Sequence, residues 1–267
     1  MVEKVDEKLD NKMDTLYKTE KYWDDRYNKQ QDSYEWLENF ETLKPFFDEI
    51  FEREQNILMS GCGNSDLSEE MYKYGFRNIT NVDYSKEVIN SMSRKTAVDF
   101  PEMEWVCSDV TDMKCFKDGQ FEVVVDKCTL DSILCSEDGY LNAVKYINEV
   151  HRVLDVGGVF LCVSYANPEH RMKFFKNDLY DFAIQYFEVE NIESNDDKKR
   201  SIDKKMMCIV FGTDVDKCFN YVYASVKLPD SDKKFNQNFN LEKVLEINNE
   251  WKTQKVGKLD EYDKNVL

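Results

Sequence analysis

Ile57-Leu58-Met59-Ser60-Gly61-Cys62-Gly63-Asn64-Ser65 is the stretch that decides the fold class of this chain. An apolar run typical of a β-strand leads into two glycines one residue apart, and residues 66–73 can start a helix. Strand, tight turn and helix in this order form the ligand-binding unit of a nucleotide-binding α/β fold. The glycines let the backbone approach a ligand, and the helix N-terminus offers unpaired N–H groups.

The turn differs from a dinucleotide-binding motif in its third glycine position. Asp66 stands there, and its negative charge would repel a pyrophosphate, which disfavours dinucleotide-dependent oxidoreduction. The next predicted strand, residues 78–82, is followed by Asp83, where an acid that binds ribose hydroxyls is expected. A ribose-bearing ligand without a pyrophosphate fits best, and S-adenosylmethionine is such a ligand.

The composition predicts one soluble α/β domain with extensions. The chain has 267 residues, of which 42% are hydrophobic, and no apolar stretch is long enough to cross a bilayer. The acidic N-terminus is unlike a secretory or mitochondrial signal, so we expect a cytoplasmic protein. Eight singly scattered cysteines and only two histidines disfavour a metal site or a disulfide framework.

The net charge of −17 bears on the partners of the protein. It argues against nucleic acid or an anionic membrane and favours a basic protein as partner. Solubility alone explains the same acidity, and this alternative stays open. We expect a monomer.

Three regions are expected along the chain. They are a flexible acidic lead-in over residues 1–20, a domain over residues 21–228, and a polar tail over residues 229–267. The tail contains one amphipathic pattern, at residues 241–251, that could pack on the domain or on a partner. A charged loop is expected at residues 195–205.

Hydrophobic periodicity places further elements inside the domain. The predicted helices cover residues 43–51, with Pro45 in the first turn, then 86–96 with Ser85 as N-cap, and 140–153. The predicted later strands cover residues 103–107, 121–125 and 159–164, followed by candidates at 182–189, 206–212 and 219–228. Two of the last three would form an antiparallel end to the sheet.

Aromatic residues are dense ahead of the first strand, where Trp23, Tyr27 and Trp36 stand out. Packing of these rings onto the domain as a lid is one explanation. The functional alternative places them over the ligand pocket, where their electron-rich faces could hold a sulfonium cation.

Acids follow two further strands. Asp109 and Val110 come after residues 103–107, where the carboxylate could accept an adenine amino proton while Val110 packs on the ring. Capping of the local backbone is the competing explanation for Asp109. Asp126, Lys127 and Asp131 follow the apolar strand at 121–125, in a loop that either carries function or caps the next helix.

With these residues in place, the chain resembles class I S-adenosylmethionine-dependent methyltransferases. Within that class it is most similar to the eukaryotic protein-lysine methyltransferases that modify translation elongation factor 1A. The resemblance extends over roughly residues 20–165, the span of one domain. The pattern that carries it reads Tyr22-Trp23-x-x-Arg26-Tyr27, Tyr34-x-Trp36, Ile57-x-x-x-Gly61-Cys62-Gly63-Asn64-Ser65, Val82-Asp83-Tyr84-Ser85, Asp109-Val110 and Asp126-Lys127-x-Thr129-Leu130-Asp131.

The resemblance implies a Rossmann-like, seven-stranded and mostly parallel sheet with helices on both faces and an antiparallel C-terminal hairpin. It also implies a set of residues around S-adenosylmethionine, consisting of Trp23, Tyr27, Trp36, Gly61, Gly63, Asp83, Tyr84, Asp109, Val110 and Lys127. The chain departs from the family at Cys128, where glycine is usual, and at Ser60, where an apolar residue is usual. Cys128 places a side chain beside the active-site loop.

Methyl transfer from a sulfonium requires alignment of the acceptor and exclusion of water, without a metal or covalent nucleophile. We predict Asp126 and Asp131 as the acids that position a lysine acceptor. A small-molecule methyltransferase and a scaffolding protein without turnover remain as alternatives, because the fold alone does not decide the acceptor.

Overall fold

The computed structural model describes residues 19–30, 32–136, 138–176, 180, 182–190 and 219–228. Its helices are α2 (Glu20–Lys29), α3 (Phe40–Ile50), α4 (Leu67–Tyr74), α5 (Lys86–Thr96), α6 (Thr129–Leu134), α7 (Gly139–Val153) and α8 (Pro168–Phe175). Its strands are β1 (Ile57–Ser60), β2 (Ile79–Asp83), β3 (Glu104–Cys107), β4 (Phe121–Lys127), β5 (Leu154–Ser164), β6 (Phe182–Glu190) and β7 (Phe219–Lys227).

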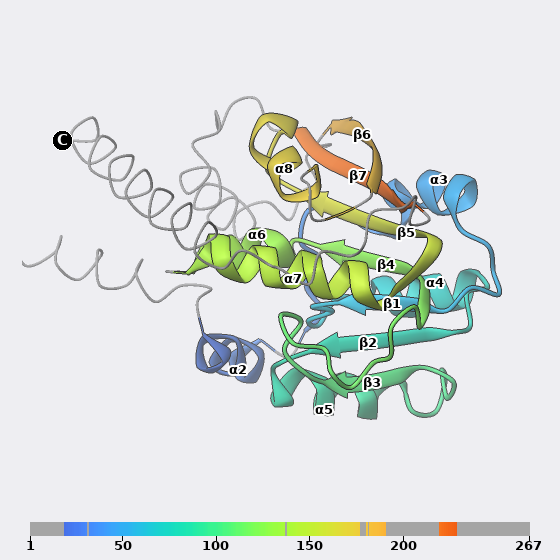
Figure 1. Cartoon of the computed structure of the whole chain (residues 1–267). Coiled ribbons are helices and arrows are strands. Elements are labelled where there is room, and N and C mark those ends of the chain that lie inside the picture. The colour runs from blue at the N-terminus through green and yellow to red at the C-terminus, as the bar shows by residue number, and fades with distance from the viewer. Residues whose placement is uncertain are drawn as a thin grey trace, which may run out of the picture.

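One seven-stranded sheet forms the centre of the molecule, in the order β3-β2-β1-β4-β5-β7-β6 (Figure 1). Strands β1 to β5 pair in parallel, and β7 pairs antiparallel with both β5 and β6. This confirms the predicted mostly parallel sheet with an antiparallel C-terminal hairpin. The strand order reverses direction at β1, which lies between β2 and β4, and a ligand crevice is expected at that switch point.

Alternating side chains of the central strands build two cores. Leu58, Val124 and Phe160 pack with α6 and α7 on one face of the sheet. Their neighbours Met59 and Val123 pack with α3 and α4 on the other face. Because successive strand residues point to opposite faces, these strands read as continuous apolar runs that are covered on both sides.

Several predicted boundaries differ from the structure. Helix α3 begins at Phe40 with Asn39 as its N-cap, so Pro45 lies inside the helix and not in its first turn. Strand β5 begins at Leu154, five residues before the predicted start, and its pairing with β4 is irregular near that end. Helix α5 has the predicted bounds, and the Ser85 side chain accepts a hydrogen bond from the Val88 N–H.

Helix α2 and the chain that follows it bring the N-terminal aromatics to the sheet. Thr19 caps α2, and the helix packs against α5. Asp24 of α2 accepts a hydrogen bond from Ser85, at the start of α5. The predicted strand at 206–212, the charged loop at 195–205 and the tail helix at 241–251 lie outside the described residues.

Candidate active site

A cavity of about 240 Å³ opens at the carboxyl ends of β1, β2 and β4, the position expected from the strand order. All ten residues that the sequence predicted around the cofactor line this one cavity, namely Trp23, Tyr27, Trp36, Gly61, Gly63, Asp83, Tyr84, Asp109, Val110 and Lys127. They come from the N-terminal segment and from the ends of four strands. Parallel strands end at the same edge of a sheet, which is why residues so far apart in sequence meet here.

The glycine turn is held close to the segment after β4. Gly61 and Gly63 have φ angles of 62° and 54°, in the left-handed region that favours glycine. A Cβ on Gly61 would lie 2.2 Å from Thr129 Oγ1, and a Cβ on Gly63 would lie 2.8 Å from the Tyr27 hydroxyl. Both positions therefore need glycine for space as well as for backbone conformation.

Asp83 is fixed between the glycine turn and the next helix. Its carboxylate accepts hydrogen bonds from the backbone N–H of Gly63 at 3.0 Å and of Ser85 at 2.9 Å. Burial raises the pKa of Asp83 to about 6, although these N–H donors act in the opposite direction. The carboxylate lines the cavity, so it can accept hydrogen bonds from ligand hydroxyls when ionised.

Asp109 caps its loop, which is one of the two explanations that the sequence left open, and its contact with adenine stays a prediction. Its Oδ1 accepts hydrogen bonds from the Thr111 backbone N–H at 2.8 Å and from the Thr111 hydroxyl at 2.9 Å. It also lines the cavity together with Val110, which is buried. Capping of the loop thus fixes a carboxyl group at the cavity wall.

The N-terminal aromatics form one side of the cavity. Trp23 stacks on Tyr27 with ring centroids 5.7 Å apart, and its centroid lies 6.1 Å from that of Trp36. Arg26 lies over Trp36, with 4.7 Å between the guanidinium carbon and the ring centroid. The rings are therefore both a packed cover on the domain and a wall of the cavity, and two of them, Trp23 and Trp36, already contact the Arg26 cation.

Asp126 does not line the cavity. Its carboxylate is fully buried and accepts hydrogen bonds from the N–H groups of Thr129 at 2.8 Å and Leu130 at 3.0 Å, and from the Tyr146 hydroxyl at 2.9 Å. Burial and the nearby Asp131 raise its pKa to about 7. Asp126 therefore holds the first turn of α6.

Asp131 also lies behind the cavity wall, fully buried. It pairs with the buried Arg171 of α8 and accepts hydrogen bonds from the Ser164 hydroxyl at 2.8 Å and the Tyr165 N–H at 3.3 Å. The role of Asp126 and Asp131 in positioning an acceptor stays a prediction, and the geometry limits it to an indirect effect through the loop that they hold.

Three residues of the same segment do line the cavity, Lys127, Cys128 and Thr129. Lys127 Nζ lies 2.5 Å from a carboxylate oxygen of Glu35 and donates to the Trp36 carbonyl at 3.0 Å. Thr129 donates to the Ser60 carbonyl at 2.8 Å and thereby supports the glycine turn. Cys128 has a φ of 72°, a left-handed conformation that favours glycine, which is the residue expected here from the resemblance.

Sequence reasoning missed several residues of the cavity wall. Tyr34, Asn64, Ser132, Ile133 and Asn142 line it as well. Tyr34 was part of the quoted aromatic pattern, which is the one signal that could have found it. Among the described residues there is no cluster of metal-ligating side chains, and no helix there is long and apolar enough to span a membrane.

The raised pKa of Asp83 predicts how cofactor affinity depends on pH. We expect ligand hydroxyls to donate to the ionised carboxylate, in which case protonation of Asp83 competes with binding. We expect the affinity for S-adenosylhomocysteine, the demethylated form of the cofactor, to be flat above pH 7 and to fall about tenfold per pH unit well below pH 6. Calorimetric titrations between pH 5 and 8 measure this, and Asp83→Asn should bind weakly with little pH dependence. An equally steep fall in Asp83→Asn would assign the titration to another group.

Comparison with known proteins identifies the family. A family model described as a methyltransferase domain matches residues 58–162. EEF1A lysine methyltransferase 4 of Mus musculus is 34% identical over 180 residues, which cover 64% of this chain and 70% of the relative. The chain belongs to this family of S-adenosylmethionine-dependent methyltransferases.

This methyltransferase also resembles part of a longer relative. The human eEF1A lysine and N-terminal methyltransferase is 38% identical over 148 residues, which span 54% of this chain and 21% of that protein. Two solved structures share the fold, the cyclase SpnF with a TM-score of 0.52 and 12% identity, and YcgJ from Bacillus subtilis with 0.51 and 15%. The matches cover 72% and 71% of this methyltransferase and 85% and 99% of those chains. At such identities the likeness concerns the fold alone.

The cofactor of the family is S-adenosylmethionine, and the cavity of this methyltransferase fits it chemically. Asp83 offers a buried carboxylate for ribose hydroxyls, and Asp109 with Val110 offers an acceptor and an apolar contact for adenine. The close packing of Gly61 on Thr129 leaves the glycine backbone itself as the cavity surface.

Proposed function

We propose that the protein transfers a methyl group from S-adenosylmethionine to a lysine side chain of a basic protein, with translation elongation factor 1A as the candidate substrate. The observation that carries the proposal is that two parts of the family pattern line one cavity together with the glycine turn, namely the aromatic residues Trp23, Tyr27 and Trp36 and the run Lys127-Cys128-Thr129. The names of the relatives support the acceptor. The net charge of −17 supports a basic partner.

The family resemblance suggests the roles of the residues, and their common position in the cavity supports them. Asp83 and Tyr84 hold the ribose and adenine, Asp109 and Val110 the adenine, and Gly61 and Gly63 let the methionine part approach the backbone. Trp23, Tyr27 and Trp36 exclude water from the cofactor. S-adenosylmethionine supplies an activated methyl group, and the protein's own task is to align the acceptor with it.

A lysine acceptor must be neutral to act as a nucleophile. Among the described lining residues the carboxylates are Asp83 and Asp109, both assigned to the cofactor, and Lys127 is paired with Glu35. The remainder of the described wall is uncharged. We propose that the acceptor ammonium loses its proton to water, because this wall does not stabilise a second charge.

We further propose that the methyltransferase domain covers residues 21–228, between a lead-in over residues 1–20 and a tail over residues 229–267. We also propose that the protein acts as a monomer in the cytoplasm. The six cysteines of the described part of the chain are free thiols, which supports a reducing compartment.

Transfer of a radiolabelled methyl group from S-adenosylmethionine tests the function. We expect labelling of elongation factor 1A, both purified and in a cell extract, to fall by roughly 10- to 100-fold in Asp83→Ala, because a buried acceptor for ligand hydroxyls is lost. Asp112→Ala removes an exposed carboxylate with the same charge and should label normally. Label found only in small molecules would favour a small-molecule methyltransferase, and no label at all would favour a scaffolding role.

A further inference from the structure

Residues 32–38, which we call the strap, connect α2 to α3 and run beside the glycine turn. The Asn64 side chain donates to the Asp32 carbonyl at 2.7 Å, and the Tyr34 N–H donates to the Asn64 carbonyl at 3.3 Å. The strap is thus hydrogen-bonded to the loop that leads into α4. Two of its side chains, Tyr34 and Trp36, line the cavity.

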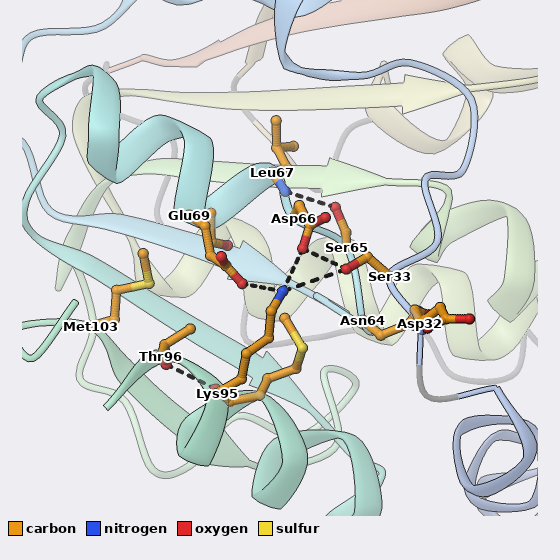
Figure 2. A network of polar contacts seen from close by, with 12 residues as sticks. Asp32, Ser33, Asn64, Ser65, Asp66, Leu67, Glu69, Lys95, Thr96 and Met103 are labelled. Atoms are coloured by element: carbon orange, nitrogen blue, oxygen red, sulfur yellow. Dashed lines mark hydrogen bonds and ion pairs between the residues drawn. The ribbon is translucent and has the colours of Figure 1, made fainter. Parts of the chain in front are cut away.

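Figure 2 shows how the start of the strap is fixed to two helices. Lys95 of α5 lies between Asp66 at 2.6 Å and Glu69 at 2.5 Å, and it contacts the Ser33 hydroxyl at 3.4 Å. Ser33 in turn donates to Asp66 at 2.7 Å. Lys95 and Asp66 are partly exposed, so solvent weakens their ion pair, whereas the Glu69 side chain is only 9% exposed. The network orients the start of the strap relative to α4 and α5.

Glu35 makes the central contacts of the strap. Its carboxylate accepts hydrogen bonds from the Asp66 N–H at 2.6 Å and the Ser65 hydroxyl at 2.8 Å, and it pairs with Lys127 at 2.5 Å. The Lys127 side chain is only 6% exposed and that of Glu35 17%. One carboxylate therefore joins the strap, the start of α4 and the end of β4, three segments that each contribute to the cavity.

Glu35 itself does not line the cavity, although its neighbours Tyr34 and Trp36 on either side do. Lys127 also binds the Trp36 carbonyl, so the same ammonium group fixes the backbone that carries this ring. The next residue, Leu37, has a φ of 57°, a conformation that is unfavourable for leucine without outside support. Beyond it, Glu38 accepts a hydrogen bond from the buried Asn220 of β7 at 2.6 Å.

We propose that Glu35 is a positioning residue for cofactor binding, which holds Tyr34 and Trp36 in the cavity wall through its contacts with Lys127 and the start of α4. The proposal rests on the assignment of this cavity to S-adenosylmethionine. A carboxylate is needed because three donors converge on it, and a glutamine would turn its NH₂ group toward one of them. The nearly buried Lys127 would then lack its counter-charge.

Binding of S-adenosylhomocysteine to Glu35→Gln, measured by calorimetry, tests the proposal. We expect the dissociation constant to rise on the order of 10- to 100-fold. Without ligand, Glu35→Gln should unfold at a lower temperature than Glu49→Gln, an exposed glutamate of α3 that serves as the matched control, because Lys127 loses its counter-charge. The variant should stay folded at the temperature of the titration, so that its loss of affinity exceeds what the lowered stability explains. In methyl transfer, KM for S-adenosylmethionine should rise while KM for the protein substrate stays unchanged. Glu35→Asp keeps the negative charge on a shorter side chain. Its dissociation constant for S-adenosylhomocysteine should lie between those of the wild type and Glu35→Gln.

The other outcomes overturn specific parts of the argument. If the wild-type protein binds S-adenosylhomocysteine and Glu35→Gln binds it equally well, Glu35 does not position the wall. If both Glu35 variants lose ligand affinity only in proportion to a lowered unfolding temperature, the residue is merely structural and the proposal is wrong. If the wild type itself does not bind, the assignment of the cavity fails, and the proposal for Glu35 fails with it.

Discussion

Replacing Asp131 with alanine is expected to lower the free energy of unfolding by about 3–5 kcal/mol, because it removes one partner of a buried ion pair. Asp131 and Arg171 are both within 1% of complete burial. Without the carboxylate, the guanidinium would stay in an apolar core of aromatic rings, including Phe174. The midpoint of urea unfolding, with the slope held constant, measures this loss.

Two further variants separate the effect of the buried charge on the free energy of unfolding from the effect of lost packing. Asp131→Leu combined with Arg171→Met removes both charges and should recover part of the lost stability, although the Ser164 hydroxyl loses a partner. Asp112→Ala removes one partner of an exposed ion pair with Lys114 and should leave the midpoint nearly unchanged.

The same experiment decides the role of Asp131 in catalysis. A stable Asp131→Ala protein that binds cofactor but no longer transfers methyl groups would favour the direct acceptor-positioning role that the sequence predicted. A destabilised protein, with activity lost in step with folding, would support the structural role indicated by its contacts.

Replacing Gly61 with alanine should abolish cofactor binding, with affinity lowered by more than roughly 100-fold. The new Cβ would lie 2.2 Å from Thr129 Oγ1 and 2.6 Å from Thr129 Cγ2, so either the turn or the start of α6 must move. The φ of 62° adds strain for any residue with a side chain, on the order of 1–2 kcal/mol. Calorimetry with S-adenosylhomocysteine and thermal unfolding measure both effects.

Gly157→Ala is the matched control for Gly61→Ala. Gly157 also has a left-handed φ, of 82°, but a Cβ there would meet no atom within 4 Å. Gly157→Ala should therefore show the backbone strain without the steric clash, and it should bind the cofactor with the affinity of the wild type. Combining Gly61→Ala with Thr129→Ala should restore part of the binding. Equal affinities of Gly61→Ala and Gly157→Ala for S-adenosylhomocysteine would contradict the steric explanation.

The predicted cofactor residues illustrate what local patterns can reveal. Asp83 and Asp109 each follow a strand, and parallel strands end at one edge of the sheet, so their meeting in one cavity could be expected from the order of elements. The segment 126–131 obeys the same rule only in part. Its lysine, Cys128 and threonine reach the cavity, whereas both aspartates turn into the core.

The boundaries of some helices and strands also could not be predicted from local sequence alone. Pro45 suggested the first turn of a helix, but Asn39 caps the helix earlier and Phe40 packs into the core. Burial of the apolar face of α3 outweighs the cost of one interior proline, which removes a backbone hydrogen bond and crowds the carbonyl four residues earlier.

The sequence by itself determined the glycine turn, the order of strands and helices, and the acids at the strand ends, because these depend on local periodicity and backbone conformation. Only the tertiary structure decided the direction of Asp126 and Asp131 and the contacts of Glu35. Asp131 meets Arg171 from 40 residues away, and Glu35 meets Lys127 from 92 residues away. Such contacts depend on how the segments pack, since a buried charge takes the partner that folding brings to it.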